Sequence, residues 1–235
     1  MSILAIDTAT QVSSVAVVSR ERLAAELTMQ ARLTHSETLM PHIEQVLKMA
    51  GVKKENLEGI AVSIGPGSFT GLRIGLAAAK AMAYALSLSV VGVPTLAALA
   101  YHYPIAGTYL VSLLDAQKAN AYVGQYRWAH GVLQEAASVA VYSVAEIVAM
   151  CAAVDEPVVL LGDVAQKMRG KLELPPNVML APAHLVMPRA ACVAMYGLDR
   201  LEKGETDNIM ALEPCYIRRS EAEVLWEKRH AGAGK

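Results

Sequence analysis

The stretch of sequence that decides the fold of this chain is IGPGSFTGLRIG, residues 64–75. It follows a short apolar run at residues 59–64 and leads into an alanine-rich stretch at residues 72–88. This order predicts a strand, a glycine loop and a helix in succession. Glycines at such a junction allow positive φ angles and close approach of backbone or ligand. Because free N–H groups at a helix N-terminus favour an anion, the first interpretation of this loop is a phosphate cradle.

Two standard phosphate motifs nevertheless do not match. The P-loop pattern requires a lysine after its last glycine, and Gly71 is followed by Leu72. The dinucleotide-binding pattern requires a third glycine at the position of Thr70, so that Gly71 comes one residue late. The loop therefore resembles a phosphate-binding loop in its glycines and in its place between a strand and a helix, but it matches neither motif.

The composition bounds the class of protein. A chain of 235 residues can form one large domain or two lobes with a substantial core. Its apolar fraction of 54% and charged fraction of 18% indicate either apolar surface covered by a partner or an alanine-rich interior. The formal net charge of -1 argues against a strongly basic nucleic-acid-binding protein.

Cysteine usage and hydropathy bear on the compartment. The three cysteines form no Cys-x-x-Cys pair, which indicates buried thiols in a reducing compartment. Asp7 interrupts the first apolar run before a signal peptide can form. Lys80 and Glu146 break the longest apolar stretches below membrane-spanning length. We therefore expect a soluble cytoplasmic protein without membrane contact.

The first half of the chain predicts a compact α/β unit. Strands are expected at residues 3–6, 13–18, 23–29, 60–64 and 90–93, and helices at residues 35–50 and 72–88. Thr34 and Glu37 fit a capping box for the first helix, which should kink at Pro41.

The second half repeats this pattern in reduced form. Strands are expected at residues 109–114, 121–126, 132–140 and 158–161, and helices at residues 144–154 and 190–203. Each half opens with a strand that ends in an aspartate, Asp7 and Asp115, which suggests a duplicated architecture. We expect a first lobe at residues 1–105, a reduced second lobe at residues 106–212, and a C-terminal segment and tail at residues 213–235 that packs back on the first lobe.

Four blocks carry a resemblance to a known family: residues 6–10, 65–75, 92–96 and 214–218. With them the chain resembles the TsaB (YeaZ) family of the actin-like ATPase superfamily over nearly its whole length. The weakest block is residues 115–122, where only Asp115, Ala116 and Tyr122 of the family pattern remain. The resemblance implies an α/β protein of the actin-like ATPase (ASKHA) fold, with two duplicated α/β lobes, mixed β-sheets and a reduced second lobe.

The resemblance also implies a function. Such a protein is a subunit of the machinery that makes threonylcarbamoyladenosine (t6A) by threonylcarbamoyl transfer to N6 of adenosine 37 in tRNAs reading ANN codons. It pairs with the similar catalytic subunit TsaD, and a small ATPase, TsaE, joins the pair. A homodimer is expected when the partner is absent. ATP and metal are expected on the partner subunits, and tRNA is met only through the complex.

Two losses predict that the chain itself is a non-catalytic homologue, without catalytic residues, metal ligands or a tightly bound cofactor. TsaD-like relatives bind a metal with two histidines four residues apart, and Thr95 and Leu99 stand at these positions. Actin-like ATPases present a Gly-Gly pair to the nucleotide. This chain has none, and Asp163 follows Gly162 where the second glycine would stand. A carboxylate beside a polyphosphate weakens binding through like-charge repulsion.

The remaining candidates for a residual phosphate loop are Asp7, Thr8, Thr10, Gly65 and Gly67. Asp and Thr are also ordinary turn residues, so a structural role stays open. His35 and His42 lie about two helical turns apart, which is too far for an adjacent ligand pair and favours surface or interface positions.

The small residues of the helix at residues 72–88 permit close approach of another helix. The resemblance places the heterodimer interface on this helix and on the helix at residues 35–50. We expect their outward faces to meet the partner, and these faces include His35, Leu39, Arg73, Ala77, Lys80 and Ala81. The alternative is that both helices merely cover their own sheet.

Two enzymatic readings compete with the subunit reading. The first is a small ATP-binding kinase or ATPase of the actin-like superfamily, with phosphate held by the Asp7 loop and the glycine block. The second, a metallopeptidase, fails because the metal histidines are missing and the chain has no His-Glu-x-x-His. No basic stripe suggests that the chain binds tRNA alone.

Overall fold

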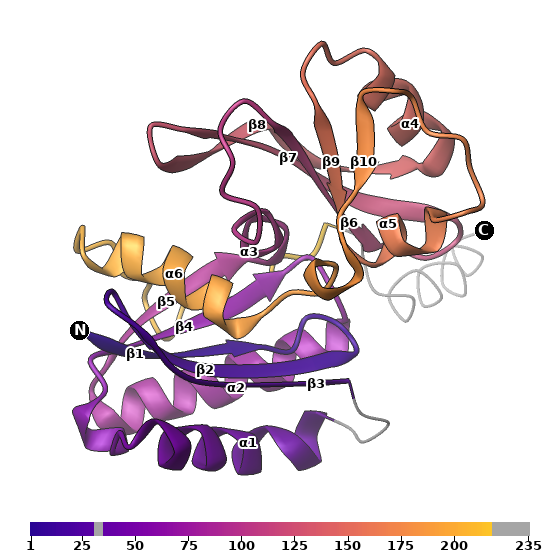
Figure 1. Ribbon diagram of the computed structural model, residues 1–235. Coiled ribbons are helices and arrows are strands. Elements are labelled where there is room, and N and C mark those ends of the chain that lie inside the picture. The colour runs from indigo at the N-terminus through magenta and orange to yellow at the C-terminus, as the bar shows by residue number, and fades with distance from the viewer. Residues whose placement is uncertain (31–34, 218–235) are drawn as a thin grey trace, which may run out of the picture.

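The computed structural model describes residues 1–30 and 35–217, which form two lobes, each built on a five-stranded sheet (Figure 1). The expected cap Thr34 and the expected tail beyond residue 217 lie outside the described residues. Duplicated lobes with mixed sheets are the architecture of the actin-like ATPase fold, and this prediction is confirmed.

The first sheet has the strand order β3-β2-β1-β4-β5. Its strands are β1 (Ser2–Asp7), β2 (Val12–Ser19), β3 (Leu23–Gln30), β4 (Gly59–Gly65) and β5 (Ser89–Pro94). The first three strands are antiparallel, and β4 runs parallel to both β1 and β5. Side chains alternate along β1, so that Leu4 and Ile6 enter one core cluster while Ile3 and Ala5 enter another.

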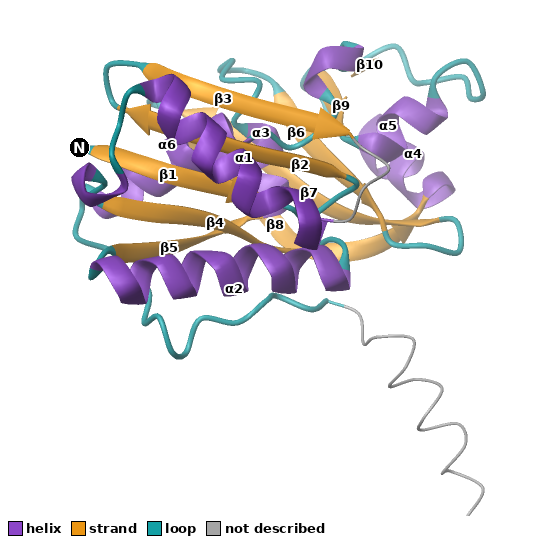
Figure 2. Cartoon of the chain, turned by 90° about the horizontal axis from the view of Figure 1, so that it is seen from below, coloured by secondary structure: helices purple, strands orange, loops and turns teal. Residues whose placement is uncertain are grey.

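Two long helices, α1 (His35–Ala50) and α2 (Phe69–Leu86), lie side by side over one face of this sheet (Figure 2). They cover the cluster that contains Leu4 and Ile6. α2 begins three residues earlier than expected because Ser68 caps it, accepting a hydrogen bond from the Gly71 N–H at 3.2 Å. Pro41 lies inside α1, which continues on both sides of it.

The opposite face of the first sheet is covered by α6 (Ala190–Leu201). The buried side of α6, including Val193, Ala194 and Leu198, packs against Ile3 and Ala61. The predicted boundary, which placed residues 106–212 together in the second lobe, is therefore wrong for this helix. Its apolar face belongs to the first lobe, and the chain returns there after completing the second sheet.

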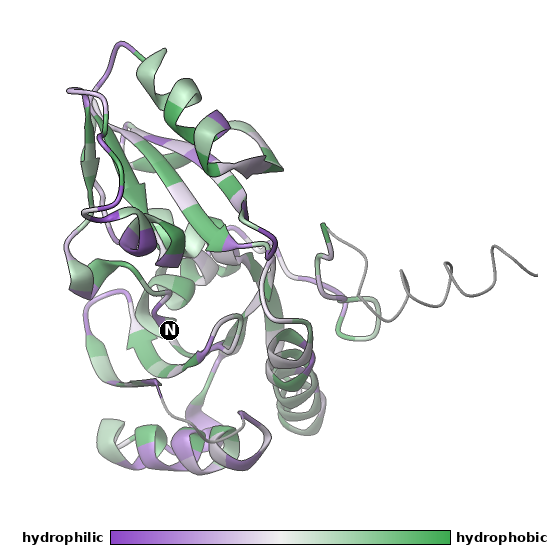
Figure 3. Ribbon diagram, turned by 90° about the vertical axis from the view of Figure 1, so that its right-hand side faces the viewer, coloured by the Kyte–Doolittle hydropathy of each residue, from purple (hydrophilic) through white to green (hydrophobic). Residues whose placement is uncertain are grey.

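The second sheet has the order β10-β9-β6-β7-β8. Its strands are β6 (Tyr109–Asp115), β7 (Asn120–Ala129), β8 (Val132–Ser143), β9 (Val158–Leu161) and β10 (Val178–Leu180). The helices α4 (Val144–Ala152) and α5 (Asp163–Met168) accompany this sheet, and α3 (Thr95–Ala100) lies where the lobes meet. Hydrophobic residues are concentrated along the strands of both lobes (Figure 3). Among the described residues, no helix is long and apolar enough to cross a membrane.

Residues 206–217, named here the C-terminal segment, run along the first lobe. The Asp207 N–H donates to the Val90 carbonyl at 2.9 Å, and the Asp207 carboxylate accepts from the Gly92 N–H at 2.7 Å. Farther along, the Cys215 N–H donates to the Ile64 carbonyl at 2.7 Å. The segment thereby forms one isolated bridge at the edge of β5 and reaches the glycine loop.

Candidate functional site

The fold brings the two predicted phosphate loops together. β1 ends at Asp7, and β4, its parallel neighbour, ends at Gly65. The loops that follow these strands therefore leave the sheet at the same edge. The Ser68 N–H of the glycine loop donates to the Ala9 carbonyl of the Asp7 loop at 2.7 Å, so the two loops are bonded to each other.

The glycines of the loop are positions where the chain packs against its own backbone. A Cβ on Gly67 would lie 2.3 Å from the Ala9 carbonyl oxygen, and one on Gly71 would lie 2.1 Å from the Thr8 carbonyl oxygen. Gly65 has a φ of +120°, and a Cβ there would lie 2.7 Å from the carbonyl oxygen of Cys215. Glycine is needed at these positions because neighbouring segments of the chain occupy the space.

Asp7 is completely buried at this junction. Its carboxylate accepts hydrogen bonds from the Ser63 hydroxyl and, at 3.2 Å, from the Ala9 N–H. Burial raises the pKa of Asp7 to about 6, although both hydrogen bonds act in the opposite direction. These partners fix the turn after β1, which is the structural role left open by the sequence.

The two threonines of the Asp7 loop are also engaged within the chain. The Thr8 hydroxyl donates to the Gly71 carbonyl at 2.8 Å, and the Thr10 hydroxyl accepts from the Val12 N–H at 3.1 Å. The five residual phosphate-loop candidates thus lie together at one edge of the sheet. Thr8 and Gly67 contact the opposite loop, whereas Thr10 bonds within its own loop and Gly65 lies against Cys215.

The equivalent position in the second lobe carries an ion-pair cluster. Asp115 ends β6, and Asp163 begins α5 after β9. Lys167 lies 2.5 Å from the Asp115 carboxylate and 3.3 Å from that of Asp163. The Lys167 ammonium holds the pKa of Asp115 below its usual value. A cation of the chain itself therefore bridges the two carboxylates.

The positions matched to metal histidines lie in the core. Thr95 and Leu99 are both completely buried, and Thr95 presents a hydroxyl that has no partner within residues 1–30 and 35–217. Those residues hold no group of three or more His, Cys, Asp or Glu side chains arranged for a metal. His42, expected at a surface or interface position, is instead buried in the free chain, with its Nδ1 3.3 Å from the Ser13 hydroxyl.

The six partner-interface candidates fall into four groups, of which the fourth is Lys80 alone. Arg73, Ala77 and Ala81 are exposed along one side of α2. The His35 ring is half-buried and donates to the Thr10 carbonyl at 2.8 Å. The outward position expected for Leu39 is wrong, since it is buried in the core beneath α1, where it shares the apolar face with other core residues of that helix.

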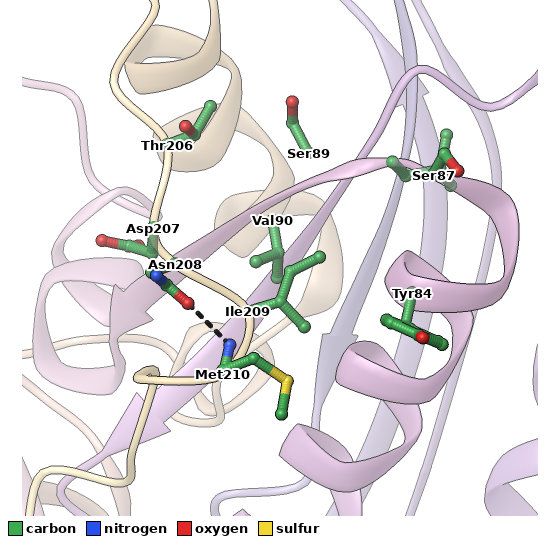
Figure 4. A pocket seen from close by; sticks show the side chains of 10 residues that line it. Tyr84, Ser87, Ser89, Val90, Thr206, Asp207, Asn208, Ile209 and Met210 are labelled. Atoms are coloured by element: carbon green, nitrogen blue, oxygen red, sulfur yellow. Dashed lines mark hydrogen bonds between the residues drawn. The ribbon is translucent and has the colours of Figure 1, made fainter.

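Lys80 faces the C-terminal segment. Its ammonium donates to the carbonyls of Met210 and Leu212 at 3.2 and 3.1 Å. The expectation that Lys80 lies on the open face of α2 is therefore corrected: it ties that segment to the helix. Beyond it, the C-terminal end of α2 and the segment border an open groove of about 480 Å³, with Tyr84 on one side and Met210 on the other (Figure 4).

An aromatic cluster that the sequence interpretation missed lies at the start of α2. The rings of Phe69 and Tyr216 stack with centroids 4.7 Å apart. The Arg73 guanidinium lies 3.9 Å from the Phe69 centroid and donates to the Tyr216 hydroxyl at 2.8 Å. The available signal was that the chain's single phenylalanine lies in the glycine block.

Comparison with known proteins identifies the family of this chain. The family model described as "TsaD: tRNA N6-adenosine threonylcarbamoyltransferase" matches residues 28–226. The chain belongs to this family. Within it, the chain is a member of the TsaB (YeaZ) group, whose curated relatives are named tRNA threonylcarbamoyladenosine biosynthesis proteins.

TsaB of Bacillus subtilis is 28% identical over 228 residues, covering 96% of this chain and 98% of the relative. TsaB of Escherichia coli is 27% identical over 97% of this chain and 98% of its own length. A crystal structure from Pseudomonas aeruginosa, described as similar to the peptidase YEAZ, superimposes with a TM-score of 0.79 at 27% identity. It covers 92% of this chain and 99% of that one. The TsaB likeness therefore extends across both lobes.

Proposed function

We propose that this chain is the non-catalytic partner subunit that pairs with a TsaD-like catalytic subunit for threonylcarbamoyl transfer to N6 of adenosine 37 in ANN-decoding tRNAs. In this proposal a TsaE-like ATPase joins the pair. The partner subunits bind ATP and metal, and this chain contacts tRNA only as part of the complex. The chain acts in the cytoplasm and forms a homodimer when it is alone.

The observation that carries the non-catalytic role is the closure of the phosphate loops. The Ser68 N–H, at the N-terminus of α2, is bonded to Ala9, and the Gly71 N–H is bonded to the Ser68 side chain. An anion at this helix terminus would need those donors free. Asp7 adds a buried carboxyl that would repel a phosphate whenever it is ionised.

The outward side of α2 supports pairing through this helix. Ala77 and Ala81 are exposed one helical turn apart, with Arg73 one turn before them. Small side chains let another helix approach closely, and the apolar area removed from water stabilises the pair by about 25 cal/mol per Å².

The test is co-purification of the chain with the TsaD-like protein of the same organism. Ala77→Glu and Ala81→Glu should abolish pairing while leaving the melting temperature unchanged, because both sites are exposed on the free chain. Ala152→Glu, at an exposed site at the end of α4 in the other lobe, is the matched control and should pair normally. Retained pairing in both α2 variants would place the interface elsewhere.

The alternative of a small ATP-binding kinase is tested separately. Calorimetry of the isolated chain with ATP and Mg²⁺ should detect no micromolar binding. Micromolar binding with turnover would overturn the non-catalytic role, whatever the outcome of the pairing experiment.

A further inference from the structure

A small cavity of about 210 Å³ lies between the lobes, and its lining includes Gly65 and Pro66 of the glycine loop and Cys215 of the C-terminal segment. Residues from both lobes line it: Pro94 and Ala97 near α3, Tyr126 on β7, Leu133 and Glu135 on β8, and Tyr196 on α6. A water molecule takes about 30 Å³ of liquid, so the cavity has room for about seven. It is smaller than the ~300–1,000 Å³ typical of drug-sized ligands, and it suits a small molecule.

The polar end of this cavity is built by a cross-strand pair. Tyr126 and Glu135 are directly opposite each other in the antiparallel register of β7 and β8. Such partners share one face of the sheet, with Cβ atoms about 4.5–5.5 Å apart. The register shifts beside Tyr126, so the pair sits at an irregularity of the kind that re-aims side chains near binding sites.

Gly124 makes room for the Tyr126 ring. A Cβ on Gly124 would lie 2.7 Å from the ring and 2.8 Å from its hydroxyl oxygen. The absence of a side chain at this position therefore lets the ring lie back along the strand. Tyr126 is 4% exposed and thus held in one place by its surroundings.

Glu135 is exposed and forms no ion pair among residues 1–30 and 35–217, and the Tyr126 hydroxyl is not one of the fully buried polar atoms that lack a hydrogen-bond partner there. Burial, together with the nearby charge of Glu135, raises the pKa of Tyr126, so the hydroxyl stays neutral. The neutral Tyr126 hydroxyl can accept a hydrogen bond from a ligand in the cavity.

The electrostatics of the lining favour a cation. Glu135 is the one charged side chain among the cavity-lining residues of the described chain. Arg200, whose charge acts to lower the pKa of Tyr196, is already paired with Asp207 and Glu205. The faces of Tyr126 and Tyr196 attract cations through their ring quadrupoles.

We propose that this cavity binds a small organic cation with an apolar body, such as an alkylammonium. Its ammonium would donate to the Glu135 carboxylate and to the Tyr126 hydroxyl oxygen, and its alkyl chain would lie against Leu133, Pro94 and Ala97. Ala77 and Ala81 do not line this cavity, and the proposal does not rest on the proposed subunit role.

The test is titration of the ¹⁵N-labelled full-length chain with n-butylammonium, followed by NMR. Amide shifts should be centred on β7 and β8 near Tyr126 and Glu135. The neutral analogue n-butanol should bind at least about fivefold more weakly, since it lacks the charge. Glu135→Gln and Tyr126→Phe should each weaken n-butylammonium binding by a similar factor.

Glu173→Gln removes an exposed carboxylate in the second lobe and is the matched control, so it should bind like the parent. Denaturant unfolding of each variant establishes that its fold is intact. Equal binding of n-butanol and n-butylammonium would overturn the proposal. So would unchanged affinity in Glu135→Gln, or the lack of saturable shifts with millimolar n-butylammonium.

Discussion

The Thr8 hydroxyl donates a hydrogen bond to the Gly71 carbonyl at 2.8 Å, and this contact locks the turn after the first strand to the first turn of α2. The same threonine limits what can stand at Gly75, where a Cβ would lie 2.3 Å from its hydroxyl oxygen. The Thr8 side chain thus explains two features of the glycine block: the Gly71 carbonyl is hydrogen-bonded, and Gly75 has no room for a side chain.

Gly75→Ala should destabilise the protein by about 1–3 kcal/mol because the added methyl meets the Thr8 hydroxyl. The sign of this stability change is informative, since alanine normally stabilises a helix by about 1 kcal/mol relative to glycine. In a Thr8→Ala background the nearest remaining atoms to the new Cβ are at 3.5 and 3.6 Å, so the same change should become neutral or stabilising. Denaturant unfolding of the four proteins measures this, and stabilisation by Gly75→Ala alone would contradict it.

Asp7 should make stability fall as the pH rises from about 4 to about 6. Its pKa in the folded state is about 6 and its reference value is 3.8, so between these values the folded chain binds more protons than the unfolded one. The advantage of Asp7→Asn over the parent should therefore grow by up to about 3 kcal/mol between pH 4 and pH 7. Urea unfolding of both proteins across this range provides the measurement. A difference that does not change with pH would show that the buried carboxyl titrates normally.

Lys167→Gln should raise the pKa of Asp115, because the ammonium that lowers it is removed. Carboxyl ¹³C NMR titration measures the shift directly, with Lys171→Gln, a change at an exposed lysine without an ion pair in the described structure, as the control. The pair is exposed, so the unfolding free energy should change by no more than about 1 kcal/mol. An unchanged Asp115 titration would rule out the ion pair in solution.

Lys80→Met should loosen the C-terminal segment, since two hydrogen bonds to its carbonyls are lost while the alkyl stem remains. The Asp207 and Cys215 amides, which bond to the first sheet, should exchange with deuterium about tenfold faster. Lys48→Met, at an exposed position on α1, is the control and should exchange like the parent. Equal protection in Lys80→Met would mean that Phe69 and Tyr216 hold the segment without the lysine.

The long elements of this fold were predictable from the sequence because their apolar periodicity is strong. Leu39 repeats with Ile43 and Val46 on the buried face of α1, so the same periodicity predicts that its side chain points into the core. The short elements α3, α5 and β10 escaped prediction because three to six residues are too few to establish a period.

What could not be predicted depends on contacts between residues far apart in the chain. Lys80 meets carbonyls 130 and 132 residues away, and Gly65 is bare because Cys215 lies against it. The glycine loop looked like a ligand site because a loop that binds phosphate and a loop that packs on backbone need the same residue. The sequence alone does not distinguish which of the two fills the space.

The return of α6 to the first lobe has a consequence for synthesis on the ribosome. The five strands of the first sheet are complete at Pro94, but the helix that covers Ile3, Ala5 and Ala61 begins at Ala190. At a synthesis rate of ~5–20 residues per second, that apolar face stays uncovered for roughly 5–20 s while the ribosome makes the other lobe. The nascent first lobe therefore passes through a stage in which it exposes a hydrophobic sheet that the finished protein never shows.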